Sequence, residues 1–257
     1  GLGPGDEIVE VNGTRLNRLD FRALIELLQR ARSQTVRLGV IHPGRVVAQD
    51  FELNPAEVSI PTVDKAFLFQ PGIAYLHLSG FDQKTPREVN EALRRLGGTS
   101  LRGLLLDLRD NRGGVLDAAL GLASLFLKPD LPLLTVRGRV MPERTHRTFA
   151  RPAHFDLPLM LLTNGNTASA AEVLTAALQE HDRALIVGEP TYGKGVVESV
   201  TALSEKTGLA LTTAQYFTPS GRSIQRPLPG TALAVTDKGL DPASNASPAF
   251  HTANGRP

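Results

Sequence analysis

The feature that most restricts the fold is a repeated alternation of strands and helices. The run Leu104-Leu-Leu-Asp-Leu108 is apolar with little alternation, as in strands buried on both faces of a parallel sheet. Further strands are predicted at residues 72–79, 133–136, 159–162 and 184–187, and helices at 85–96, 115–127 and 168–181. This order predicts an α/β core with helices packed on a largely parallel sheet, followed by a β-rich C-terminal part with strands at 196–200 and 209–217.

The first 53 residues form a separate, smaller pattern. It consists of a strand that ends in the turn Asn12-Gly13, a helix over residues 20–31, and strands at 36–40 and 46–53. Residues 54–66 are polar and contain two prolines, which favours an extended connector. We therefore expect a small module at 1–53, a connector at 54–66 and a core domain at 67–257, with a loop in the stretch after Leu240.

Composition narrows the function classes. The 28 basic and 26 acidic side chains are interspersed, so nucleic acid is not an expected partner. The absence of cysteine excludes thiol chemistry, disulfides and cysteine zinc sites, and the six histidines show no metal-ligand spacing. We expect no metal and no cofactor. No segment has the roughly 18 consecutive apolar residues of a membrane span, and because the chain starts without methionine we expect a signal peptide or anchor to precede it.

Ser169 is the first candidate for chemistry. It follows the turn Asn164-Gly165 and precedes an apolar helical run, so its hydroxyl would lie at a helix N-terminus, where backbone N–H groups favour a developing negative charge. Ser169 and Glu172 also fit a capping box, in which the serine only satisfies the end of the helix. The spacing alone leaves both interpretations open.

Lys194 is the second candidate, because a serine nucleophile needs a base. Gly193 and Gly195 flank it and allow the backbone to approach another segment closely. To accept a proton the amine must be neutral, and we expect burial to favour that form. The alternative is an ordinary solvated lysine in a turn.

A second glycine loop, Asp107-Leu-Arg-Asp-Asn-Arg-Gly-Gly114, follows the buried strand at 104–108. Since Ser169 also follows a strand, both loops should meet at the carboxyl edge of the sheet. The N–H groups of Gly113 and Ala170 would then form a two-donor oxyanion hole. The alternative is a tight turn in which Asp107 and Arg109 pair for structural reasons.

Taken together, these motifs resemble the carboxyl-terminal processing peptidases, PDZ-containing Ser/Lys endopeptidases of the S41 type. The resemblance extends over nearly the whole chain. It rests on five segments: Gly1-Leu-Gly-Pro-Gly-Asp-Glu-Ile8, Leu106-Asp-Leu-Arg-Asp-Asn-Arg-Gly-Gly114, Thr167-Ala-Ser-Ala-Ala-Glu172, Gly188-Glu-Pro-Thr-Tyr-Gly-Lys-Gly195 and Tyr216-Phe-Thr-Pro-Ser-Gly-Arg-Ser-Ile-Gln225.

The resemblance implies a ClpP/crotonase-like core preceded by the second half of a PDZ domain. It makes Ser169 the nucleophile and Lys194 its general base, with Gly113 and Ala170 as oxyanion donors. It further implies protein or peptide substrates recognised through C-terminal tails and a possible homo-oligomer. The expected location is periplasmic, secreted or membrane-anchored outside the cytoplasm.

The sequence departs from the family pattern at three places. Glu198 replaces a glutamine that usually follows the lysine by four residues, Thr167 and Ala171 replace two serines of the nucleophile motif, and segments expected at both ends are missing. A carboxylate beside Lys194 would favour the ammonium form and oppose its role as base. Glu198 either points away or titrates together with Lys194.

Three other functions remain open. Gly188 to Lys194 fits a phosphate-binding loop up to the lysine, but Gly195 replaces the hydroxyl residue that binds Mg²⁺ and a strand is predicted where such a loop needs a helix. A PDZ-bearing peptide-binding or scaffold protein, catalytically impaired through Glu198, is the non-enzymatic alternative. A Ser-His mechanism would have to use His77 on the strand at 72–79.

Replacing Glu198 by glutamine removes the carboxylate that favours the ammonium form of Lys194, so the pH profile of peptide cleavage should shift toward lower pH. Rates measured against pH for the wild type and for Glu198→Gln test this, and superimposable profiles would contradict it.

Overall fold

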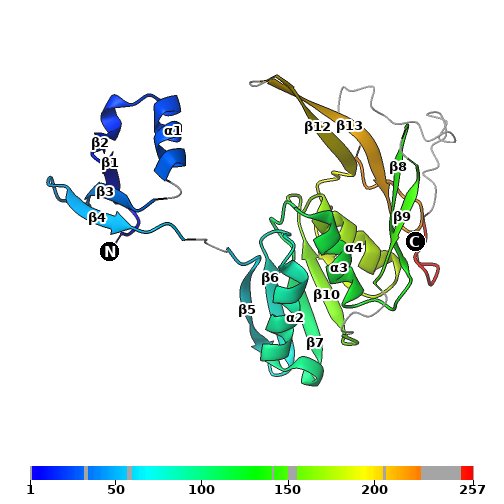
Figure 1. Cartoon of the computed structure of the whole chain (residues 1–257). Coiled ribbons are helices and arrows are strands. Elements are labelled where there is room, and N and C mark those ends of the chain that lie inside the picture. Colours follow the sequence, from blue (N-terminus) through cyan, green and yellow to red (C-terminus); the bar gives the residue numbers. More distant parts are fainter. Residues whose placement is uncertain are drawn as a thin grey trace. The chain divides into compact units, whose positions relative to one another are not determined.

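The computed structural model describes residues 2–31, 34–56, 60–140, 142–149, 155–204, 207–226 and 250–256. The chain divides into two compact units, Gly1–Ile60 and Pro61–Pro257 (Figure 1). The division falls within the predicted connector at 54–66. Each unit is considered by itself.

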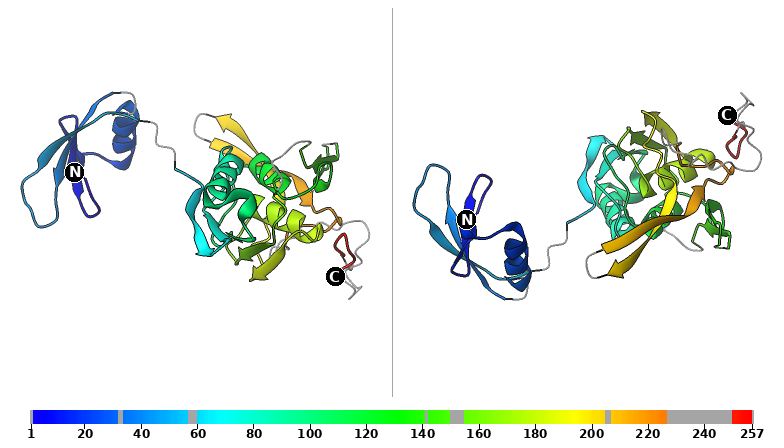
Figure 2. Two further views of the ribbon diagram at one scale, coloured as in Figure 1. Left: turned by 90° about the horizontal axis from the view of Figure 1, so that it is seen from below. Right: turned by 90° about the horizontal axis from the view of Figure 1, so that it is seen from above.

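The first unit is a four-stranded antiparallel sheet with one helix (Figure 2). Its elements are β1 (Glu7–Val11), β2 (Thr14–Arg15), the 3-10 helix η1 (Leu16–Arg18), α1 (Phe21–Ala31), β3 (Val36–Ile41) and β4 (Gln49–Leu53), with strand order β2-β1-β3-β4. Val11, Leu38 and Val40 form its small buried core. The strands and the helix predicted for residues 1–53 are confirmed.

The second unit contains the predicted parallel sheet. Its strands are β5 (Val63–Gln70), β6 (Ile73–Leu78), β7 (Gly103–Asp107), β10 (Leu159–Thr163) and β11 (Leu185–Gly188), in the order β11-β10-β7-β6-β5. All neighbouring pairs are parallel except β5 with β6. Leu104 and Leu106 on the central strand β7 are buried, which explains the apolar run in the sequence. The α/β core is confirmed.

Three helices connect and cover these strands: α2 (Thr85–Leu96), which is followed by the 3-10 turn η2 (Gly98–Ser100), α3 (Leu116–Ser124) and α4 (Ala170–Glu180). Helix α2 packs on β5, β6 and α3, and α3 packs on α4 (Figure 1). Almost every residue of α4 is buried, so this helix lies in the middle of the unit. Among the described residues no helix is long and apolar enough to cross a bilayer.

A second, antiparallel sheet completes the unit, with the order β12-β13-β8-β9. Its strands are β8 (Pro132–Gly138), β9 (Arg144–Arg147), β12 (Val196–Ser204) and β13 (Thr207–Phe217). The strand predicted at 133–136 therefore exists, but it belongs to this antiparallel sheet and not, as the sequence pattern predicts, to the parallel one. Its backbone pairs with β13 and β9, long-range partners that the local pattern does not reveal.

One boundary also differs from prediction. β5 begins at Val63, inside the predicted connector, because residues 63–66 already pair with β6. The loop expected after Leu240, at residues 241–248, lies outside the described residues.

At the carboxyl end of β7, the buried carboxylate of Asp107 forms an ion pair with the half-exposed guanidinium of Arg109. The carboxylate accepts hydrogen bonds from the Arg109 guanidinium, at 2.6 Å for the shortest, and from the Tyr75 hydroxyl at 2.7 Å. Burial opposes the charged form, but the bonds from Arg109 and Tyr75 outweigh it, and the pKa of Asp107 lies below the ordinary value. The structural pairing of Asp107 with Arg109 is thus present.

This ion pair predicts a pH-dependent stability. Because the pKa of Asp107 is lowered by folding, its contribution is complete above the ordinary aspartate pKa of about 3.9 and is lost as the pH falls below it. Asp107→Asn should lower the free energy of unfolding by about 2 kcal/mol at about pH 7 and by clearly less at about pH 3. Urea unfolding followed by circular dichroism measures both values.

The matched control is Asp130→Asn, since Asp130 pairs with Arg147 at a fully accessible position, with 85% of its side chain exposed. This variant should change stability little at either pH, because exposed ion pairs contribute little. An Asp107→Asn effect that stays equal at both pH values would contradict the prediction.

Candidate active site

The two glycine-containing loops meet at the carboxyl edge of the parallel sheet, as predicted. Thr167 Oγ1 donates to Leu108 O at 2.8 Å, and Ala168 N–H donates to Asn111 O at 2.9 Å. The side chains of Asn164 and Asn166 both donate to Asp110 Oδ1, at 3.0 and 2.8 Å. The loop that carries Ser169 is therefore fixed to the loop that follows β7 along its whole length.

Ser169 has an unusual backbone conformation at the start of α4. Its φ and ψ angles are 56° and −118°, in a region that non-glycine residues rarely adopt. Such a residue costs of order 1–3 kcal/mol and is maintained only when its surroundings fix it. Strained serines between a strand and a helix are typical of nucleophiles whose hydroxyl must face outward.

Gly113 lies directly against Ser169. A Cβ added at Gly113 would lie 2.9 Å from Ser169 Cβ and 2.9 Å from Ala170 N, and φ is +90°. Only glycine fits this position. The Gly113 N–H, however, donates to Asn111 Oδ1 at 2.9 Å, so this predicted oxyanion donor already has an acceptor. The Ala170 N–H has no acceptor among the described residues.

Glu172 connects Ser169 to the loop at residues 189–195 that carries Lys194, here called the lysine loop. Its carboxylate is 3% exposed and accepts the Ser169 N–H at 2.8 Å, which is the carboxylate half of the predicted capping box. It also accepts the N–H groups of Gly193 and Lys194, at 2.6 and 2.8 Å, and the Thr191 hydroxyl at 2.7 Å. Because one oxygen receives both Ser169 N–H and Lys194 N–H, these two backbone nitrogens lie at most two hydrogen-bond lengths apart.

The side chain of Lys194 is accessible and paired. It is 45% exposed, and its Nζ lies 3.3 Å from Glu198 Oε2. The expectation of a buried lysine is therefore wrong for this structure, because Lys194 precedes β12, which is the edge strand of its sheet among the described residues and has mostly exposed side chains. Glu198 does not point away from Lys194.

The other candidate sites are less well supported. Both ring nitrogens of His77 already have partners, with Nδ1 at 2.5 Å from Asp64 Oδ1 and Nε2 at 3.3 Å from Arg109 O. A strand, β12, follows Lys194, as predicted, where a phosphate-binding loop needs a helix. The described residues contain no group of acidic and histidine side chains that could hold a metal ion.

Sequence reasoning missed two residues of this site. The sequence pattern predicts only a capping role for Glu172, although this residue belongs to the nucleophile motif. It predicts no role for Asn111, yet Asn111 is fully buried, and its side chain donates to Leu78 O at 2.8 Å and accepts the Gly113 N–H at 2.9 Å. The asparagine between a buried strand and two glycines was the available signal.

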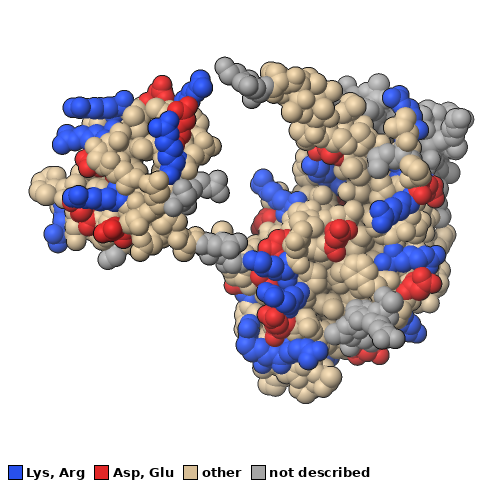
Figure 3. All heavy atoms as spheres, in the orientation of Figure 1, with Lys and Arg blue, Asp and Glu red and all other residues tan. Residues whose placement is uncertain are grey.

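The distribution of charge on the surface does not indicate nucleic acid as a ligand. On the larger unit, Figure 3 shows basic and acidic side chains interspersed over the face in view. An even mixture of this kind does not produce the positive field that nucleic acids require.

Comparison with known proteins points to one family. The profile described as peptidase family S41 matches residues 72–232. The "Carboxyl-terminal-processing protease" of Synechocystis sp. is 35% identical over 231 residues, which cover 88% of this chain and 53% of the relative. The "Carboxyl-terminal-processing peptidase 2, chloroplastic" of Arabidopsis thaliana is 31% identical and covers 88% of this chain and 45% of the relative.

A solved structure agrees. The "Photosystem II D1 C-terminal processing protease" matches with a TM-score of 0.56 and 31% identity, over 86% of this chain and 60% of that one. The chain spans about half the length of the curated relatives it matches.

The Glu172 contacts predict a large loss of activity without loss of the fold. In Glu172→Gln the amide group faces N–H donors where the carboxylate accepted them, so the lysine loop should move relative to Ser169. A displacement of about 1 Å typically costs on the order of 100-fold in rate. Peptide cleavage should fall by about this factor, measured as kcat, while circular dichroism remains unchanged.

Glu189→Gln is the matched control in the same loop, because Glu189 is exposed and its backbone carbonyl alone accepts the Thr163 hydroxyl. It should keep the wild-type kcat. Equal rates for Glu172→Gln and Glu189→Gln would show that the buried carboxylate does not position the two residues.

Proposed function

The chain belongs to peptidase family S41, and from this premise we propose that it is a serine peptidase that cleaves proteins near their C-termini. Ser169 is the nucleophile and Lys194 the general base in this proposal. The observation that carries it is the bridge through Glu172, whose carboxylate binds the backbone of both residues and thereby joins them in one rigid unit.

The reaction proceeds through an acyl-enzyme. Lys194 takes the proton of the Ser169 hydroxyl while the oxygen attacks the substrate carbonyl, and the tetrahedral intermediate expels the amine, which receives the proton from Lys194. Water activated by the same amine then releases the second product. Ala170 N–H, which has no acceptor among the described residues, is the donor available to the oxyanion.

Gly113 is the second donor of the proposed oxyanion hole. Its N–H donates to Asn111 Oδ1 in the resting protein, at 2.9 Å. The oxyanion must therefore share this N–H with Asn111 or replace it. A developing negative charge is a stronger acceptor than a neutral amide oxygen, so the exchange is favoured only as the intermediate forms.

Lys194 must lose a proton before it acts. In this structure its Nζ lies 3.3 Å from Glu198 Oε2, and the side chain is accessible to water.

The remaining features of the family complete the proposal. The first unit, with its strands β1, β3 and β4 and helix α1, would be part of a PDZ domain, and the second unit a ClpP/crotonase-like core. Substrates would be unfolded proteins or protein tails recognised by their C-terminal regions, as the names of the relatives suggest. The protein would act outside the cytoplasm, as a possible homo-oligomer, without a metal or cofactor.

A catalytically impaired scaffold remains the alternative, and one observation favours it, namely the exposed Lys194–Glu198 ion pair. A scaffold function, however, gives no reason for the strained backbone of Ser169 or for a buried carboxylate that joins the serine to the lysine loop. The peptidase accounts for both of these features.

The direct test compares the wild type with Ser169→Ala on an unfolded protein such as casein. Cleavage should fall by at least about 10³-fold, because no other group in the site replaces the nucleophile. Gel electrophoresis and mass spectrometry of the products measure both the rate and the position of cleavage.

Ser100→Ala serves as the control, since this serine lies in the turn after α2 and donates only to Gly97 O, at 2.8 Å. It should cleave as the wild type does. Equal cleavage by Ser169→Ala and wild type would overturn the proposed nucleophile, and binding without cleavage by the wild type would favour the scaffold.

A further inference from the structure

The segment at 216–226, here called the strap, has no role in the reaction described so far. It leaves the end of β13, turns back at residues 218–222 and runs beside the loop that carries Lys194. Thr218 N–H donates to Arg222 O at 2.9 Å, and Ile224 N–H donates to Tyr216 O at 3.3 Å, so the turn is closed by its own backbone. The strap contains the family segment that ends at Gln225.

Gln225 binds the lysine loop directly. Its Oε1 accepts the N–H of Gly195 at 2.9 Å, and its Nε2 donates to Arg226 O at 2.8 Å. The second bond fixes which end of the amide faces Gly195. On either side of this contact, Arg226 N–H donates to Gly193 O at 3.1 Å and Tyr216 N–H donates to Gly195 O at 2.8 Å.

The two glycines beside Lys194 are what allow the strap to lie so close. A Cβ at Gly195 would be 2.4 Å from Gln225 N, and a Cβ at Gly193 would be 2.3 Å from Arg226 Cγ. No other side chain fits at either position without moving the strap. The close approach to another segment that the sequence predicts at Gly193 and Gly195 is therefore the contact with the strap.

Lys194 is consequently held from two sides. The N–H groups of Gly193, Lys194 and Gly195 all donate to side chains, the first two to Glu172 and the third to Gln225. Glu172 belongs to the first turn of α4, whereas Gln225 belongs to the strap. The direction of the Lys194 side chain depends on both, because its backbone has little freedom left.

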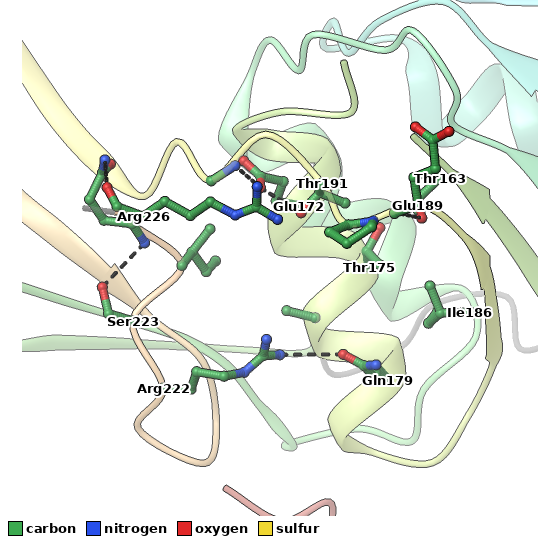
Figure 4. Close-up of a pocket in the computed structure, with 15 residues that line it drawn as sticks. Thr163, Glu172, Thr175, Gln179, Ile186, Glu189, Thr191, Arg222, Ser223 and Arg226 are labelled. Carbon is green, nitrogen blue, oxygen red and sulfur yellow. Dashed lines mark hydrogen bonds between the residues drawn. The ribbon is translucent and has the colours of Figure 1, made fainter. Parts of the chain in front are cut away.

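The strap is itself anchored to α4. Glu180, in the last turn of that helix and 6% exposed, accepts Ser220 N–H at 2.8 Å and the Arg222 guanidinium at 2.9 and 3.1 Å. Arg222 also reaches Gln179 on the same helix, across the cavity lined by α4, the lysine loop and the strap (Figure 4). The helix that starts at Ser169 thus fixes the lysine loop at one end and the strap at the other.

We propose that Gln225 is a positioning residue for Lys194, and that the strap transmits the position of α4 to the lysine through the Gly195 N–H. This inference rests on the proposed function of Ser169 and Lys194. Gln225 should affect the chemical step rather than substrate binding, since its amide oxygen accepts the backbone N–H of Gly195 in the lysine loop.

The test replaces Gln225 by methionine, which keeps the length of the side chain and removes the acceptor and donor. The kcat for casein cleavage should fall about 10- to 100-fold, as expected for a displaced catalytic group, with KM within about 2-fold of wild type. The rate at which a fluorophosphonate labels Ser169 should fall by the same factor. kcat is expressed per labelled site, so partial unfolding cannot imitate the effect.

Gln70→Met is the matched control. It makes the same replacement at an exposed position at the end of β5, the edge strand of the parallel sheet on the side opposite β11, which is not part of the lysine loop, the strap or α4. It should keep kcat. If Gln225→Met does not fold, Gln225→Asn, whose amide is one methylene too short to reach Gly195, takes its place with the same expected loss.

The outcomes separate this inference from the proposed function. Unchanged kcat and labelling in Gln225→Met, with Ser169→Ala inactive, would overturn the role of Gln225 alone. Cleavage by Ser169→Ala at the wild-type rate would overturn the proposed function, whatever Gln225→Met does. A parallel loss of kcat in Gln70→Met would show a general effect of replacing a glutamine by methionine and would also overturn the inference.

Discussion

The buried carboxylate of Glu172 is the interaction on which the site depends. It lies in the first turn of α4, where the helix dipole favours a negative charge, and its four donors come from Ser169, Thr191, Gly193 and Lys194. Removing a charge from water is costly unless hydrogen bonds compensate it. The lysine loop supplies three of these bonds, so the same contacts that make the carboxylate tolerable also bring Lys194 beside the serine.

The parallel sheet explains why these segments are near one another at all. Strands β7 and β10 are neighbours, and both end at the same edge, where the loops that carry Gly113 and Ser169 leave them. Helix α4 begins there and is buried along nearly its whole length. It acts as a rigid axis, with the nucleophile at its start and the anchor of the strap, Glu180, at its end.

Much of this arrangement could be predicted from local sequence. The apolar strand at 104–108 and the loops after it indicated the sheet edge, and the resemblance indicated Ser169 and Lys194.

The features that local sequence does not predict depend on long-range contacts. β8 has an ordinary strand pattern, and only its partners place it in the second sheet. The exposure of Lys194 depends on β12 being an edge strand, and the acceptor of Gly113 N–H depends on how Asn111 is buried. Glu172 matches a capping residue in sequence, because its contacts to the lysine loop come from residues about 20 positions away.

If Glu172 makes Ser169 and the lysine loop one cooperative unit, their backbone amides should open together. Amide hydrogen exchange of the intact protein, resolved by NMR, measures this directly at Ser169, Gly193 and Lys194. We expect all three amides to be protected and to open with the same free energy, although the Lys194 side chain is exposed. Protection of Ser169 combined with exchange of Gly193 and Lys194 at the rate of an open loop would contradict it.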